Sequence, residues 1–165
     1  MSIAWLHGAS VGDVRALHVL SKHLRVARPE LSFKVSAMTS NGREMARALF
    51  PDETVTRPPL EFPGCAGRAL RQTRPSILLL EYLELWPLWV SACQRLRIPV
   101  VVVDGRVTQR SLRIRPILRG SAGSISLFCA QTHGDARRAI ELGVRPDRVA
   151  VYGNAKFDGV LDGPP

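Results

Sequence analysis

The chain has 165 residues, a net charge of +9 and an apolar content of 45%, which suit one globular domain with a sizeable core. No apolar run approaches the roughly 20 residues that a membrane-spanning helix needs, and no secretory signal peptide is recognisable. The three cysteines form no CxxC pair, which supports neither a zinc site nor a disulfide framework, and the thiols of Cys93 and Cys129 are expected to be buried. The basic residues are scattered without interleaved aromatic residues, so nucleic acid is not an expected partner.

Short apolar runs alternate along the chain with segments of helical periodicity. We expect strands over residues 3–6, 33–37, 77–80, 100–103, 125–130 and 149–152, and helices over 11–26, 41–49, 66–72, 86–96, 108–118 and 134–142. The proline-rich segment 51–63 is expected to be mostly extended, and Pro116 to interrupt its helix. The sequence therefore predicts a Rossmann-like α/β fold, a three-layer parallel sheet with helices on both faces.

A polar stretch follows each predicted strand. In chain order these junctions read HGASVGD, MTSNG, EYLELWP, DGRVTQRS, QTHGD and GNAKFD. Because the carboxyl ends of parallel strands meet at one edge of a sheet, we expect the six junctions to converge on a ligand-binding rim. HGASVGD has neither the spacing of GxGxxG nor the lysine of a Walker loop, so it supports a nucleotide site only weakly.

Asp13, at the start of the helix predicted over 11–26, has two interpretations. Either Ser10 or Asp13 caps the helix in an ordinary tight turn, or the Asp13 carboxylate, favoured by the helix N-terminus, acts as a general base toward a substrate hydroxyl. In both cases His7 is placed to orient the loop.

Two other junctions offer groups that would suit an anion. Thr39, Ser40 and Asn41 either cap the following helix or present backbone N–H groups to an anionic ligand. Lys156, at the last junction, either stabilises an anion or lies on the solvated surface.

The third and fourth junctions bring carboxylates and arginines. Glu81 and Glu84 follow a buried strand, where an unpaired carboxylate is costly, so they either serve a site or pair with an arginine. Arg106 and Arg110 either hold a phosphate or carboxylate or begin a solvated helix.

Taken in order, the junctions resemble the motifs of the 3-deoxy-D-manno-octulosonic acid (Kdo) transferases. HGASVGD is similar to their HxxSVGE, MTSNGRE to TMTxTGxE, EYLELWP to ETELWPN, and DGRVTQRS to NARLSxRS. QTHGDARRAIELGV and VAVYGNAKFD are similar to QxxxDxxRxxxLG and VxVTGNLKFD. Each motif alone is weak, but six in the same order from about Ile3 to Asp158 form a specific signal.

The resemblance implies the N-terminal, acceptor-binding half of a GT-B glycosyltransferase that transfers Kdo from CMP-Kdo to a lipid A precursor in lipopolysaccharide biosynthesis. Residues 1–158 would form the acceptor-binding domain and residues 159–165 a remnant of the interdomain linker. The donor-binding C-terminal domain and the membrane-anchoring helix are expected to be absent, so the isolated domain would be inactive without its donor domain. The resemblance implies no metal and no cofactor. It implies peripheral docking to the anionic lipids of the inner membrane, on its cytoplasmic face.

Individual roles also follow from the resemblance. Asp13 replaces the glutamate that serves as base, with one methylene fewer, and Lys156 matches the lysine that stabilises the transition state. Glu84 matches the second glutamate of ETELWPN, while Tyr82 or, with one inserted residue, Glu81 takes the place of the first. The residues expected to contact the acceptor are Ser10, Gly12, Thr39, Asn41, Arg106 and Arg110.

Two other functions stay open. One is a stand-alone Rossmann-like module that binds an anion or a nucleotide, for which tight nucleotide binding would be the sign. The other is the acceptor domain of a different GT-B enzyme, such as a relative of the sugar-nucleotide epimerases, which the SVG and ELWP motifs disfavour.

Overall fold

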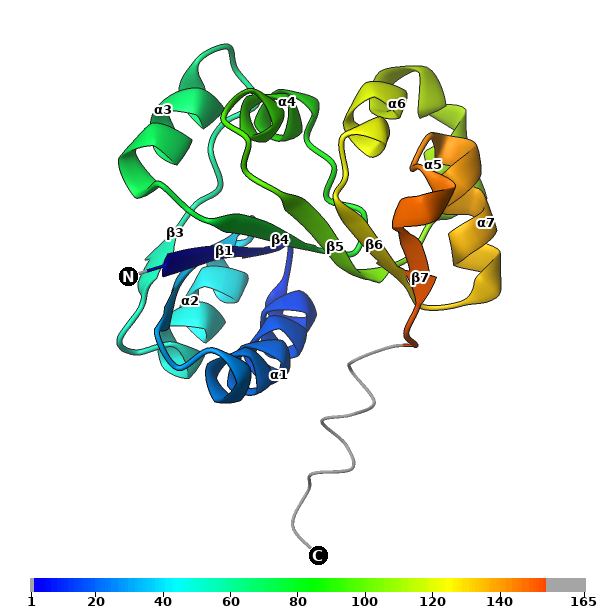
Figure 1. Ribbon diagram of the computed structural model, residues 1–165. Coiled ribbons are helices and arrows are strands. Elements are labelled where there is room, and N and C mark those ends of the chain that lie inside the picture. The colour runs from blue at the N-terminus through cyan, green and yellow to red at the C-terminus, as the bar shows by residue number, and fades with distance from the viewer. Residues whose placement is uncertain (1, 154–165) are drawn as a thin grey trace, which may run out of the picture.

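The computed structural model describes residues 2–153, which form one seven-stranded parallel sheet between two layers of helices (Figure 1). The strands are β1 (Ser2–Gly8), β2 (Leu31–Ala37), β3 (Thr54–Thr56), β4 (Ile77–Glu81), β5 (Val100–Gly105), β6 (Leu127–Ala130) and β7 (Val149–Val151). Their order in the sheet is β3-β2-β1-β4-β5-β6-β7, so the direction of winding reverses between β1 and β4. In open α/β sheets, ligands bind at such a switch point, beyond the carboxyl ends of the strands.

The helices divide between the two faces of the sheet. In the view of Figure 1, α1 (Val11–Ala27) and α2 (Ser40–Leu49) lie below the sheet, and α3 (Cys65–Thr73), α4 (Pro87–Arg95) and α6 (Arg115–Gly123) lie above it. The helices α5 (Gln109–Arg113) and α7 (His133–Leu142) lie near β6 and β7, and a 3-10 turn, Pro146–Arg148, leads into β7. The three-layer parallel fold predicted from the sequence is confirmed.

Each face of the sheet packs its own apolar cluster, and β4 contributes to both. Leu78 and Leu80 belong to the cluster under α3 and α4, whereas Leu79 belongs to the cluster over α1 and α2. The upper cluster includes Trp5 and Trp89, whose rings meet edge to face with centroids 5.2 Å apart. A strand that is covered on both faces needs no polar alternation, which explains the continuous apolar run at residues 77–80.

Two details differ from the sequence-based expectations and one confirms them. Segment 51–63 contains a seventh strand, β3, which pairs only with β2 at the edge of the sheet. The interruption expected at Pro116 is confirmed: the helix predicted over 108–118 is divided into α5 and α6 at Ile114, because Pro116 fits the first turn of a new helix better than the middle of a long one. Cys93 is buried, but Cys129 is only half-buried, because the helices below the sheet lie under β1 and β2 rather than under β6.

Two parts of the prediction lie outside the described residues, namely Lys156 and the boundary between residues 158 and 159. Within residues 2–153, none of the helices combines the length and the apolar character that crossing a bilayer requires.

Candidate functional site

The first junction closes around the carboxylate of Asp13. Its Oδ2 accepts hydrogen bonds from the N–H of Ala9 at 3.0 Å, the N–H of Ser10 at 2.9 Å and the hydroxyl of Ser10 at 3.0 Å. Gly8 permits this turn, because a Cβ at that position would lie 2.6 Å from the Cβ of Asp13. Asp13 keeps 7% of its surface exposed. The structure therefore confirms that Asp13 caps the start of α1, whereas the role of Asp13 as a base stays a prediction.

The second junction packs directly against the first. The N–H of Thr39 donates to the carbonyl oxygen of Ala9 at 3.1 Å, and the Thr39 hydroxyl caps α2 by accepting from the N–H of Gly42 at 3.0 Å. Gly42 leaves little space for a side chain, since a Cβ would lie 2.9 Å from Oγ1 of Thr39 and 3.3 Å from the backbone of Ser10. The two helix starts therefore form one surface, on which the predicted acceptor contacts Ser10, Gly12, Thr39 and Asn41 are all exposed.

The third junction places its two glutamates in different environments. Glu81, the last residue of β4, is 1% exposed, whereas the side chain of Glu84 is 24% exposed. Tyr82 adopts a left-handed backbone conformation with φ of 56°, which turns the chain between them. Glu84 Oε2 accepts the indole N–H of Trp86 at 3.0 Å and lies 3.9 Å from Nε2 of His7.

The electrostatics link this junction to the first. Burial raises the pKa of Glu84, the hydrogen bond from Trp86 lowers it, and the nearby Asp13 carboxylate raises it again, with a net upward shift. Asp13 and Glu84 therefore interact electrostatically at the switch point of the sheet, whereas Glu81 is buried in the interior.

The fourth junction lies further along the rim. Arg106 and Arg110 are both exposed and follow β5, which is separated from β1 by β4 and therefore lies roughly 10 Å from it at ordinary strand spacing. The loop between them is held by α7. Asp135 Oδ1 accepts the N–H of Val107 at 3.0 Å, and Arg138 donates to the carbonyl oxygen of Val107 and to Asp135. The aspartate and arginine of QTHGDARR therefore serve the fold of this loop.

The last junction begins at the opposite edge of the sheet. β7, the strand that precedes Lys156, lies four positions from β1, which corresponds to roughly 19 Å at ordinary strand spacing.

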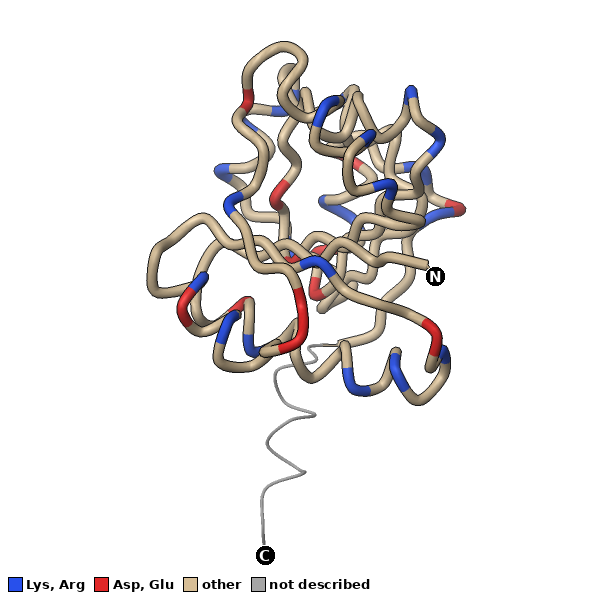
Figure 2. Tube along the Cα trace, turned by 90° about the vertical axis from the view of Figure 1, so that its left-hand side faces the viewer, with Lys and Arg blue, Asp and Glu red and all other residues tan. Residues whose placement is uncertain are grey.

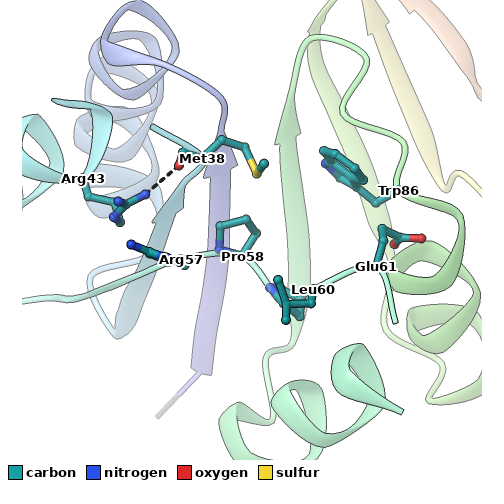
Figure 3. A pocket seen from close by; sticks show the side chains of 8 residues that line it. Met38, Arg43, Arg57, Pro58, Leu60, Glu61 and Trp86 are labelled. Carbon is teal, nitrogen blue, oxygen red and sulfur yellow. Dashed lines mark hydrogen bonds between the residues drawn. The ribbon is translucent and has the colours of Figure 1, made fainter. Parts of the chain in front are cut away.

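A pocket of about 410 Å³ is lined on one side by Trp86, whose indole N–H donates to Glu84 (Figure 3). Met38, which follows β2, and Trp86, which precedes α4, face one another across it, and segment 57–61 crosses between them. Its lining combines apolar side chains with two arginines and one glutamate, namely Met38, Arg43, Arg57, Pro58, Pro59, Leu60, Glu61 and Trp86.

Hydrogen bonds fix the two sides of this pocket. Arg43 donates to the carbonyl oxygens of Ala37 at 3.1 Å and Met38 at 2.6 Å. The Glu61 carboxylate accepts the backbone N–H groups of Leu88 at 3.0 Å and Trp89 at 3.1 Å, and so caps the start of α4 from segment 57–61.

The pocket was not predicted from the sequence. The only signal for it was the stretch RPPLEFPG at residues 57–64, where an arginine and two large apolar side chains lie among prolines. Within residues 2–153, no group of three or more histidine, cysteine, aspartate or glutamate side chains is arranged to hold a metal ion.

Comparison with known proteins agrees with the motifs. The sequence matches the family described as "3-Deoxy-D-manno-octulosonic-acid transferase (kdotransferase)" over residues 2–159. A 3-deoxy-D-manno-octulosonic acid transferase from Haemophilus influenzae is 30% identical over 159 residues, which cover 93% of this chain and 37% of that protein. Its counterpart from Bordetella pertussis is 29% identical over 168 residues, covering 95% and 38%. The chain thus spans little more than a third of the length of these relatives.

Solved structures of other proteins share the fold of this chain. The UDP-GlcNAc 2-epimerase from Neisseria meningitidis superposes with a TM-score of 0.66 at 17% identity, covering 98% of this chain and 49% of that one. MurG from Acinetobacter baumannii superposes with a TM-score of 0.63 at 10% identity, covering 93% and 45%. At such identities the likeness shows the fold alone.

Proposed function

Because the chain belongs to the 3-deoxy-D-manno-octulosonic-acid (Kdo) transferase family, we propose that it is the acceptor-binding half of a glycosyltransferase that transfers Kdo from CMP-Kdo to a lipid A precursor. One observation carries the proposal. The motif carboxylate Glu84, which interacts electrostatically with Asp13, accepts a hydrogen bond from Trp86, and Trp86 lines an apolar and basic pocket near the switch point of the sheet. Since the chain spans 37% of the relative from Haemophilus influenzae, we assign donor binding to the remainder of a longer protein.

The chemistry of the pocket suits such an acceptor. A lipid A precursor is an acylated, phosphorylated sugar, so it needs apolar walls and cations in one site. Met38, Leu60 and Trp86 supply apolar surface, while Arg43 and Arg57 supply charge that complements phosphate. In the transfer itself, Asp13 would take the proton of the attacking hydroxyl and Lys156 would offset the negative charge that develops on the departing phosphate.

The test is direct binding by this chain. We expect saturable binding of a lipid A precursor dispersed in detergent, and a loss of affinity of about tenfold, or about 1.4 kcal/mol, in Arg57→Ala. Arg137→Ala, on the exposed side of α7, is the matched control and should bind like the parent. Tight binding of CMP without binding of the lipid would instead support the stand-alone nucleotide module.

We further propose that the chain associates peripherally with the cytoplasmic face of the inner membrane. Leu60, in the segment 57–61 that crosses the pocket, is 75% exposed, and Phe62, directly after this segment, is 66% exposed. Figure 2 shows basic residues on helices on both sides of the sheet, so the apolar pair and its neighbours, rather than the net charge alone, would select the docking face. Basic residues near an anionic bilayer contribute about 1 kcal/mol each.

Vesicle binding tests this location. The double variant Leu60→Ser, Phe62→Ser should sediment less with vesicles that contain anionic lipid than the parent does. Val26→Ser, which removes an even more exposed apolar side chain from the end of α1, is the control. Equal sedimentation of the double variant and the parent would contradict the proposed docking face.

A further inference from the structure

His7 forms the centre of a buried polar chain at the end of β1. Its side chain is fully buried, and Nδ1 lies 3.1 Å from the carbonyl oxygen and 3.0 Å from the hydroxyl of Ser36. The Ser36 hydroxyl also accepts the indole N–H of Trp5 at 2.9 Å. The imidazole meets the ring of Trp89 edge to face with centroids 5.0 Å apart. The orientation of the His7 ring is therefore fixed on two sides by β2 and α4.

These contacts determine which ring nitrogen of His7 carries the proton. A carbonyl oxygen only accepts hydrogen bonds, and the Ser36 hydroxyl has another acceptor in the carbonyl oxygen of Leu6 at 3.5 Å, so the contacts with Ser36 favour a proton on Nδ1. Burial lowers the pKa of His7 to about 4, against the opposing effects of Ser36 and Asp13, so the ring is neutral at pH 7. Nε2 is then an acceptor, and within the described residues it makes no hydrogen bond.

The group that Nε2 faces is the carboxyl of Glu84, whose Oε2 lies 3.9 Å away. A shift of about 1 Å would bring the two atoms to hydrogen-bond distance. A proton on Glu84 suits this position, because the side chain is largely buried and the Asp13 carboxylate nearby makes a second negative charge costly.

We propose that His7 is a positioning residue whose Nε2 shares one proton with Glu84, and that this pair holds the Trp86 indole in the wall of the pocket. The proton lies between the Glu84 carboxyl and Nε2, and no other group gains or loses one. Glu84 Oε2 accepts the indole N–H of Trp86 at the same time. The chain of contacts thus runs from Ser36 in the core, through His7 and Glu84, to a side chain that lines the pocket.

Nitrogen NMR of the labelled chain tests the pair without any ligand. We expect the parent to show the tautomer protonated at Nδ1. Glu84→Ala should shift the His7 Nε2 resonance and the Trp86 indole resonance. Both contacts of Glu84 fall on Oε2, so Glu84→Gln can keep only one of them. With its amide oxygen at that position it accepts from the indole, and the indole resonance should stay near its parental position while the His7 Nε2 resonance shifts. An unchanged Nε2 resonance in Glu84→Ala would overturn the proposal.

The variant His7→Asn tests the same pair by replacing the imidazole instead of the carboxyl group. The amide keeps a donor toward Ser36 and removes the atom that faces Glu84, so the Trp86 indole resonance should shift as it does in Glu84→Ala. Amide resonances of β6 and β7 report whether the variant remains folded, and if it does not, the two Glu84 variants decide the question. A folded His7→Asn chain with a parental indole resonance would overturn the proposal.

The role of the pair in ligand binding rests on the proposed function. Glu84→Ala should lose about tenfold in affinity for the lipid A precursor because the indole wall is no longer fixed. If the parent does not bind this lipid, the proposed function fails, whereas the imidazole and indole resonances still decide whether the pair exists. If the parent and Glu84→Ala bind equally, the pair does not shape the pocket.

Discussion

Substitutions of Asp13 can separate its structural role from its proposed catalytic role. In Asp13→Ala, the N–H groups of Ala9 and Ser10 and the Ser10 hydroxyl lose their common acceptor. A buried donor without a partner costs about 1–3 kcal/mol, but Ser10 is exposed and Ala9 half-buried, so water replaces part of the loss. We expect the free energy of unfolding to fall by about 2 kcal/mol, which in a chain of this size lowers the midpoint of thermal unfolding by about 4–8 °C.

Two more conservative substitutions of Asp13 should lower the free energy of unfolding by less than Asp13→Ala does. Asp13→Asn keeps a carbonyl oxygen but loses the charge, and because charge-assisted hydrogen bonds are about twice as strong as neutral ones, about half of the stabilisation that these hydrogen bonds contribute is retained. Asp13→Glu completes the S-x-x-E capping box and should unfold close to the parent. Glu141→Ala, which removes an exposed carboxylate from α7, is the control and should change the stability by less than about 0.5 kcal/mol.

The assay compares stability with transfer. Urea unfolding of this chain measures the free energies, and Kdo transfer by the longer protein measures the reaction. If Asp13 is the base, Asp13→Asn loses transfer although most of its stability remains. A parental urea midpoint in Asp13→Ala would show that capping contributes nothing, and a parental transfer rate in Asp13→Asn would exclude Asp13 as the base.

Three further changes test the surroundings of the site. Gly8→Ala should destabilise the chain by about 1–3 kcal/mol, because its Cβ would lie 2.6 Å from that of Asp13, and a parental thermal midpoint would refute this close packing. Burial raises the pKa of Asp135, but hydrogen bonds, including that from Arg138, lower it overall from 3.8. Its stabilising contribution is therefore complete above the unfolded pKa and lost as pH falls through the lower folded value, so Asp135→Asn should lose stability less steeply below about pH 4 than the parent. Equal slopes in acid unfolding would contradict this. Glu61→Ala should lower the free energy of unfolding by about 1 kcal/mol by uncapping α4, and Glu61→Gln by less; no change in Glu61→Ala would show that the cap is not stabilising.

The sequence predicted most of the fold because its signals are local. Apolar runs and helical periodicity located six of the seven strands and the helices, and parallel pairing then placed the junctions along one edge. The strand β3 was missed because its three residues are stabilised by pairing with β2 at the sheet edge, which the local pattern does not encode.

The candidate site was only partly predictable, because it depends on backbone geometry and distant contacts. The sequence left Glu81 and Tyr82 as alternatives for one motif position and did not show which of Glu81, Tyr82 and Glu84 faces the rim. In the structure the chain turns at Tyr82, Glu81 is buried and Glu84 is partly exposed. The pocket depends on the path of segment 57–61, and a proline-rich stretch has no periodicity from which that path could be inferred.

The Glu61 carboxylate belongs to two parts of the molecule at once, the lining of the pocket and the first turn of α4. Thermodynamic reciprocity then couples them. A ligand that binds more tightly when segment 57–61 is in place protects the first amides of α4 from hydrogen exchange, and a ligand that binds more tightly when the segment is displaced exposes them. Leu88, whose amide reports the change, is 27 residues from Glu61 in the sequence. Slower exchange of this amide would indicate a ligand that binds with the segment in place, and faster exchange a ligand that displaces it.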